Sequence, residues 1–161
     1  MTDLTADEVR SMYDYDPLSG LLTRRFGSGG RKAGSVVGNV GADGRVQMYV
    51  NGRNYKAHRV IWLYVTGEWP RHDVDHIDGN PSNNRWNNLR DVPHHVNLQN
   101  RRTHTKHNQL RVIGVTPNKG RFGAQIKLNG KRIWLGTFDT PEEASAVYLE
   151  SKRKLHAGCT V

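Results

Sequence analysis

The sequence predicts an α+β protein with small antiparallel sheets. Two Asn-Gly pairs, at residues 51–52 and 129–130, each lie between short runs of strand-forming residues, which is the strongest short-range signal for a β-hairpin. Two capping-box patterns, beginning at Thr5 and Thr140, each mark the start of a helix. Signals for hairpins and for helices therefore occur in both halves of the chain.

The first elements follow from local patterns. The capping box at Thr5 predicts a helix over residues 6–12. A turn over residues 16–20 and a strand over residues 21–26 come next. Residues 27–44 are rich in glycine and form either a flexible surface loop or a loop that follows DNA, and the sequence does not separate the two.

A hairpin and a buried helix are predicted in the middle of the chain. Strands over residues 46–50 and 53–56 flank the first Asn-Gly pair. Residues 58–66 are apolar on several faces and end at Gly67, so they predict a buried helix that is too short to cross a membrane. Residues 71–100 then supply a strand, a loop, a second strand and a helix.

We predict two domains joined by a linker. Residues 101–110 are polar and charged without hydrophobic periodicity, which indicates a linker. The first domain is placed at residues 1–102, the linker at residues 103–112 and the second domain at residues 113–158.

The second domain is predicted as a three-stranded antiparallel sheet with one backing helix. Strands are expected over residues 113–116, 121–128 and 131–138, and Thr140-Pro141 opens a helix whose apolar positions would cover one face. Alternation along the strands leaves a largely basic set on the other face. Its members are Arg121, Gln125, Lys127, Arg132 and Trp134.

The charge balance favours a nucleic-acid partner. The chain has 161 residues, a formal net charge of +9 and a pI near 10.0, and such a field attracts phosphate backbones in a salt-dependent way. A solvated basic surface is the alternative. Cys159 is the single cysteine, which predicts a reducing compartment without a disulfide framework. We see no secretory signal or long apolar run and expect a soluble, intracellular protein without membrane partners.

Asp75 and His76 stand side by side in a stretch that is rich in asparagine. A carboxylate suits Mg²⁺, which prefers oxygen ligands and keeps several waters. An imidazole titrates near neutrality and can accept a proton from an attacking water. The alternative is an ion pair in a loop, beside asparagines that only satisfy the backbone of turns.

This stretch resembles the zinc-less branch of the HNH, or ββα-metal, endonucleases that are common in phage genomes and mobile introns. Asp75 and His76 match the start of the family pattern, and two asparagines match its later positions, twelve (76 to 88) and twenty-one (76 to 97) residues after the histidine. The resemblance implies a ββα core at about residues 71–100. It also implies cleavage of DNA to 5′-phosphate and 3′-hydroxyl ends.

The resemblance assigns a role to each matched residue. It implies that His76 is the general base and that Asn88 braces the loop and orients the histidine. It implies that Asp75 and Asn97 hold one Mg²⁺, or Mn²⁺ in its place. A structural zinc would need paired cysteines, so none is expected in a chain with Cys159 alone.

Further DNA contacts are expected outside this core. In the intron-encoded relatives a basic sheet lies in a DNA groove, and the first hairpin would supply such a sheet. The linker would also lie across DNA. The expected contacts in these two segments are Arg45, Gln47, Arg53, Lys56, Arg101 and Arg102.

Residues 114–158 resemble the DNA-binding domain of plant ethylene-response factors, the Apetala-two type. The resemblance implies that DNA contacts come from Gln125, Lys127, Arg132 and Trp134. Trp134 could instead be a sheet aromatic that covers apolar surface. Two arginines of the family pattern are replaced by Ile113 and Thr116, so the plant target sequence does not carry over.

Together the patterns predict a DNA-directed, Mg²⁺-dependent endonuclease of the phage or intron-homing kind. It would act on double-stranded DNA in the cytoplasm of a bacterial host, as a monomer or a weak dimer. The alternative is a DNA-binding regulator or packaging accessory whose nuclease motif is inactive.

Overall fold

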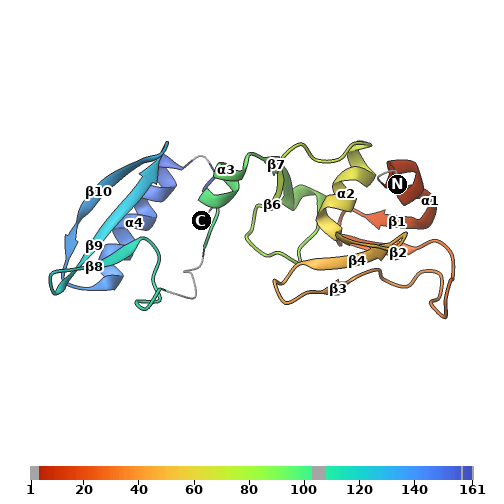
Figure 1. Ribbon diagram of the computed structural model, residues 1–161, viewed down its shortest axis with the longest axis horizontal. Coiled ribbons are helices and arrows are strands. Elements are labelled where there is room, and N and C mark those ends of the chain that lie inside the picture. The colour runs from red at the N-terminus through yellow and green to blue at the C-terminus, as the bar shows by residue number, and fades with distance from the viewer. Residues whose placement is uncertain (1–3, 103–107, 157, 161) are drawn as a thin grey trace. The chain divides into compact units, whose positions relative to one another are not determined.

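The computed structural model describes residues 4–102, 108–156 and 158–160 (Figure 1). The chain packs as two units, of which one ends at His94 and the other begins at His95. Helices and small antiparallel sheets occur in both units, so the predicted α+β class is confirmed. The predicted boundaries at residues 102 and 113 stay predictions, and residues 103–107 of the predicted linker lie outside the described residues.

The first unit begins with a capped helix and a short strand pair. Helix α1 spans Ala6–Met12, and the Thr5 hydroxyl accepts from the Glu8 amide while the Glu8 carboxylate accepts from the Thr5 amide, as the capping box predicts. Strand β1 (Tyr13–Asp16), which the sequence patterns did not predict, pairs antiparallel with β2 (Leu21–Arg24). The predicted strand over residues 21–26 therefore ends two residues early.

The predicted central hairpin is confirmed. Strands β4 (Val46–Val50) and β5 (Arg53–Lys56) pair antiparallel, and β3 (Asn39–Val40) adds a short third strand beside β4. The two turn residues, Asn51 and Gly52, have φ values of 48° and 79°. Both lie in the left-handed region that a two-residue hairpin turn requires, which explains the Asn-Gly pair.

Helix α2 (Ala57–Thr66) organises the core of the first unit. It packs against α1, β4, β5 and the next strand, β6. The helix ends at Gly67, whose φ of 86° is the left-handed conformation typical of a helix C-terminus. Its buried side chains form the core with those of α1 and β4. The most completely buried are Val9, Met48, Val60, Ile61 and Leu63.

The ββα unit follows in the predicted order. Strand β6 (Asp73–His76) pairs antiparallel with β7 (Leu89–Val92). Between them lie a loop and a single 3₁₀ turn, η1 (Trp86–Asn88). Helix α3 (His94–Gln99) follows β7 after Pro93.

The second unit is a three-stranded antiparallel sheet backed by one helix, as predicted (Figure 1). The strands β8 (Val115–Asn118), β9 (Arg121–Leu128) and β10 (Lys131–Phe138) lie in the order β10-β9-β8. Strand β8 runs past Pro117 because it is an edge strand, where a missing amide hydrogen is tolerated. Helix α4 (Pro141–Leu155) packs against all three strands.

Side chains alternate across this sheet. Ala124 and Ile126 are buried on the helix side, while Trp134 is paired with Gln125 across β9 and β10. A bulge between Trp134 and Gly136 shifts the register, and Leu135 joins the core. No helix of the described residues is both long and apolar enough to cross a membrane.

Candidate active site

The end of strand β6 carries the two residues on which the site depends. Asp75 and His76 are 7% and 5% exposed, so both polar side chains are buried. Neighbouring residues of a strand point to opposite faces. Accordingly, Asp75 lies with its cross-strand partner Arg90, whereas His76 meets the loop that follows β6 and helix α2.

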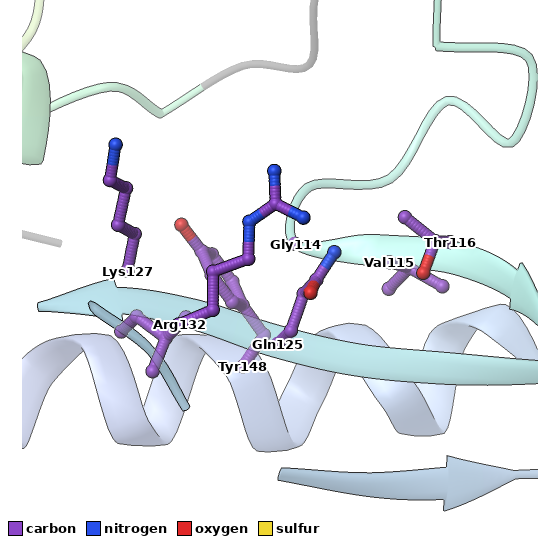
Figure 2. Close-up of a pocket in the computed structure, with 8 residues that line it drawn as sticks. Gly114, Val115, Thr116, Gln125, Lys127, Arg132 and Tyr148 are labelled. Carbon is purple, nitrogen blue, oxygen red and sulfur yellow. The ribbon is translucent and has the colours of Figure 1, made fainter. Parts of the chain in front are cut away.

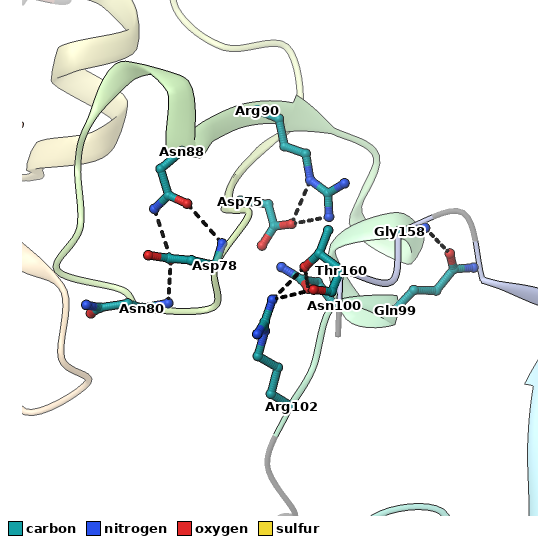
Figure 3. A network of polar contacts seen from close by, with 10 residues as sticks. All are labelled: Asp75, Asp78, Asn80, Asn88, Arg90, Gln99, Asn100, Arg102, Gly158 and Thr160. Carbon is teal, nitrogen blue, oxygen red and sulfur yellow. Dashed lines mark hydrogen bonds and ion pairs between the residues drawn. The ribbon is translucent and has the colours of Figure 1, made fainter. Parts of the chain in front are cut away.

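Asp75 is held by a salt bridge across the hairpin. Arg90 Nε and Nη2 donate to the same carboxylate oxygen, Asp75 Oδ2, at 3.0 and 2.7 Å (Figure 3). The two residues are directly opposite each other in the β6–β7 register. Arg90 therefore fixes the orientation of the carboxylate, and charge-assisted bonds of this length are strong ones.

His76 is oriented by a buried amide. Its Nε2 lies 3.0 Å from Asn84 Oδ1, and Asn84 is only 3% exposed. Because a carbonyl oxygen can only accept, this contact places the proton of a neutral ring on Nε2 and makes Nδ1 the basic nitrogen. Burial lowers the pKa of His76, while the bond to Asn84 raises it. The net shift is downward, which favours the neutral ring.

A second histidine packs on the first. The rings of His58, on α2, and His76 meet edge to face with centroids 5.1 Å apart. His58 is 5% exposed, and its Nδ1 has no hydrogen-bond partner among the described residues. Burial, aided by the positive charge that His76 would carry, lowers the pKa of His58 to about 3. His58 is therefore neutral near pH 7 and packs against the His76 ring.

Asn84 is fixed by the β1–β2 strand pair and the turn between these strands. The Tyr15 hydroxyl donates to the Asn84 carbonyl at 2.8 Å. Gly20 has a φ of 77°, and a Cβ there would lie 2.6 Å from the Asn84 carbonyl carbon and 2.5 Å from the Arg85 nitrogen. Glycine is thus needed at position 20 for close approach. Strands β1 and β2 thereby support the amide that orients His76.

Asn88 braces the loop from within. Its Oδ1 accepts from the Asp78 amide at 2.9 Å, and its Nδ2 donates to Asp78 Oδ1 at 2.9 Å (Figure 3). The same Nδ2 also donates to the Asn83 carbonyl at 2.7 Å. The carboxylate of Asp78 also accepts from the Asn80 amide at 2.8 Å. These bonds fit the bracing role expected for Asn88. The amide on the histidine ring is that of Asn84.

Asn97 lies on α3 in the second unit, where its carbonyl accepts from the Asn100 amide at 3.0 Å. Its role as a ligand beside Asp75 stays a prediction. Among the described residues, no group of three or more His, Cys, Asp or Glu side chains is arranged to hold a metal ion. One carboxylate and one amide oxygen fit a hard cation that keeps waters or takes phosphate oxygens as further ligands.

The second unit has a hollow that is lined in part by residues expected to contact DNA. It measures about 350 Å³ (Figure 2). Thr116, Gln125 and Lys127 contribute from β8 and β9, Arg132 from β10 and Tyr148 from α4. Two basic side chains, an amide and hydroxyls can all bond phosphate oxygens or base edges.

Trp134 lies on the same face with 53% of its surface exposed. A Cβ at Gly123 would lie 2.2 Å from the end of the indole ring, so the ring rests on the bare backbone of β9. Packing therefore accounts for part of this side chain, and the remaining half is open to a partner. Arg121, the last member of this face, pairs with Asp139 at 2.8 Å.

The expected contacts in the first hairpin are engaged within the protein. Lys56 and Arg45 both pair with Asp43, at 2.8 and 3.5 Å. The Gln47 side chain accepts from Asn54 at 2.8 Å. Hydrogen bonding to Lys56 lowers the pKa of Asp43 to about 2. These pairs lie on the surface, so they leave the hairpin able to exchange partners.

The comparisons with known proteins bear on the ββα region. The family model described as HNH endonuclease matches residues 55–99, a segment that includes Asp75, His76, Asn88 and Asn97. HNH nucleases use divalent metal ions, and the match supports a DNA-cleaving hydrolase at the level of the family. No solved structure matches the chain.

Two residues of the site escaped the sequence patterns. The sequence patterns single out neither Asn84 nor Arg90. A cross-strand register would have paired Arg90 with Asp75, since the two are directly opposite. No local signal distinguishes Asn84 from the other asparagines of the loop.

Proposed function

We propose that the protein is a divalent-metal-dependent DNA endonuclease in which His76 is the general base. One observation carries the proposal. The buried imidazole of His76 has its Nε2 fixed by Asn84, lies next to the Asp75 carboxylate in the chain, and falls inside the segment that matches the HNH family. A neutral imidazole of fixed tautomer is suited to accept the proton of a water molecule.

The residues divide the work of phosphodiester hydrolysis. His76 takes the proton from a water that attacks phosphorus, the bond from phosphorus to the 3′-oxygen breaks, and the leaving 3′-oxygen takes a proton from a solvent water. The products carry 5′-phosphate and 3′-hydroxyl ends. Asp75 and Asn97 are the residues that would hold Mg²⁺ or Mn²⁺, and Arg90 keeps the Asp75 carboxylate oriented. When bound, the metal ion supplies positive charge to the phosphate and the leaving oxygen.

We propose that the second unit binds double-stranded DNA through the face around the hollow. Residues 106–161 carry ten Lys and Arg against four Asp and Glu, a net +6 of the chain's +9. The binding should therefore be strongly salt-dependent. The proposed contacts on this face are Arg121, Gln125, Lys127, Arg132 and Trp134. Those outside this face are Arg53, Lys56, Arg101 and Arg102.

The finer biological assignment is a phage or intron-homing enzyme that acts in the bacterial cytoplasm. It rests on the sequence pattern that begins at Asp75 and on the resemblance of the second unit to Apetala-two domains. A monomer with one site hydrolyses one strand, so double-strand cleavage would need a second copy on the DNA.

The salt bridge between Arg90 and Asp75 favours one other candidate. Because both Arg90 bonds fall on a carboxylate expected to hold the metal, the motif could be inactive and the protein a DNA-binding regulator or packaging accessory. A binder of this kind would shift DNA in a gel whether or not metal is present, and would leave it intact.

Replacing His76 separates the two candidates. In His76→Ala, cleavage should fall on the order of 10²- to 10⁴-fold, the usual contribution of a general base, while DNA affinity stays unchanged. His72→Ala is the matched control, since His72 is exposed four residues earlier in the chain. Equal losses of cleavage and affinity in His76→Ala would remove the basis for its role as base.

A further inference from the structure

Helix α3 belongs to the nuclease match by sequence and to the second unit by packing. The family match runs to residue 99, whereas the second unit begins at His95. Residues 95–99 therefore lie in both. Asn97, the proposed second metal ligand, is among them, so the contacts that hold α3 within the second unit bear on the proposed site.

Gly158 lies flush against the peptide that precedes Asn97. Its amide donates to Gln99 Oε1 at 3.0 Å (Figure 3). A Cβ at position 158 would lie 2.2 Å from the Val96 carbonyl oxygen and 2.9 Å from Val96 Cγ1. A Cβ atom does not lie within 3.0 Å of a non-bonded heavy atom, so any larger residue at position 158 must move α3 or lose this contact.

Thr160 fastens the residues just after α3. Its hydroxyl donates to Asn100 Oδ1, and Arg102 Nη2 donates to both Thr160 oxygens at 2.8 Å (Figure 3). Asn100 is only 4% exposed. A buried amide oxygen that loses its donor is costly, so the Thr160 hydroxyl is a specific constraint on this segment.

Lys152 ties the same segment to the sheet-backing helix α4. It is 2% exposed, and its ammonium donates to the Arg101 carbonyl. Burial lowers the pKa of Lys152. A buried cation is expensive unless it is hydrogen-bonded, and here the carbonyl that it meets is two residues beyond the end of α3.

We propose that Gly158, Thr160 and Lys152 are positioning residues for Asn97, the proposed metal ligand on α3. The inference rests on the proposed function, because Asn97 must be a ligand for its position to matter to cleavage. The basic face of β9 and β10 and the ligand-bearing helix then move together.

The test uses the full chain and one matched pair of variants. Thr160→Val keeps the shape but loses the hydroxyl, whereas Thr160→Ser keeps the hydroxyl. The Mn²⁺ concentration for half-maximal nicking should rise on the order of 10-fold in Thr160→Val, as for other residues that support a metal ligand, and should be near the wild-type value in Thr160→Ser. Gly158→Ala should resemble Thr160→Val.

DNA affinity, measured by gel shift in EDTA, separates an effect on the position of Asn97 from an effect on DNA binding. It should be the same in the three variants and the wild type, because every charged side chain that is proposed to contact DNA, Arg102 included, is kept. An unchanged Mn²⁺ requirement in both Thr160→Val and Gly158→Ala would overturn the proposal. So would a loss of DNA affinity with no change in the metal requirement.

Amide hydrogen exchange tests the hydrogen bond between Thr160 and Asn100 without any need for cleavage. Amides of residues 97–101 should exchange about 3- to 10-fold faster in Thr160→Val than in Thr160→Ser, as expected when one buried hydrogen bond is lost. Equal exchange rates in Thr160→Val and Thr160→Ser would show that this hydrogen bond does not hold the segment, even if the enzyme is active. If exchange responds but the wild type cuts no DNA, the contact stands, the role in metal positioning falls, and it is the proposed function that has failed.

Discussion

His76 Nε2 and Asn84 Oδ1 lie 3.0 Å apart, between two side chains that are both buried. The backbone of Asn84 is in turn held by the Tyr15 hydroxyl, 69 residues earlier in the chain. The orientation of the proposed base therefore depends on a hairpin that lies outside the matched segment of residues 55–99.

Replacing Asn84 should impair cleavage without weakening DNA binding. Asn84→Ala removes the acceptor that fixes the ring, and we expect plasmid nicking at saturating Mg²⁺ to fall on the order of 10- to 100-fold, as for other partners that orient a catalytic or metal-binding histidine. Asn84→Asp keeps an acceptor oxygen and should retain more activity. Equal nicking rates in Asn84→Ala and the wild type would contradict the proposed role.

Asn88 should matter chiefly for the stability of the loop. Asn88→Ala removes three hydrogen bonds, two of them to Asp78, from a side chain in a residue that is 7% exposed. We expect a loss of about 1–3 kcal/mol in the free energy of unfolding, the cost of leaving buried polar groups unpaired. Urea denaturation followed by tryptophan fluorescence measures it. An unchanged midpoint would mean that the loop does not need this brace.

His58 should make the protein less stable in acid. Its pKa is about 3 in the folded protein against 6.5 for a free side chain, so the unfolded state binds more protons below pH 6.5. The free energy of unfolding is unaffected by this group above pH 6.5 and decreases as the pH falls below it. By about pH 5 the titration of His58 alone should lower the free energy of unfolding by about 2 kcal/mol.

Urea unfolding at pH 7 and pH 5 measures that contribution against a variant that does not titrate. The wild type should lose more stability between the two pH values than His58→Gln does. The same pH dependence in both proteins would show that His58 is not a buried neutral imidazole.

The basic face of the second unit should contribute charge contacts to DNA. Lys127→Ala and Arg132→Ala should each weaken binding and reduce the slope of log affinity against log salt by about 0.9, the value for one phosphate contact. Lys154→Ala is the control, since Lys154 pairs with Glu150 on the exposed side of α4. An equal effect of Lys154→Ala would point to net charge and not to this face.

Elements with local signals were predictable from the sequence. The capping boxes at Thr5 and Thr140 and the turn at Asn51-Gly52 work through neighbours within a few residues, and the structure has each where it was predicted. Strand β1 was not predicted. Its sequence YDYD alternates aromatic and charged residues as a strand does, but over only four residues directly after helix α1, and the strand is defined by its pairing with β2.

The site was only partly predictable, because several of its contacts are with residues that are distant in the sequence. Adjacent Asp75 and His76 could be found as a pattern, and their burial followed from the fold. The partner of His76 could not be chosen among the asparagines of one loop, because the choice depends on how Tyr15 and Gly20 seat that loop. The Arg90 salt bridge needs the β6–β7 register, which sequence periodicity does not give.

Incubation of the purified protein with supercoiled plasmid in Mg²⁺, Mn²⁺ or EDTA is the most direct test of the central claim. We predict nicking in either metal, none in EDTA, and loss of nicking in both Asp75→Ala and His76→Ala. Binding of the plasmid without cutting in any metal, or cutting that survives in His76→Ala, would contradict the account.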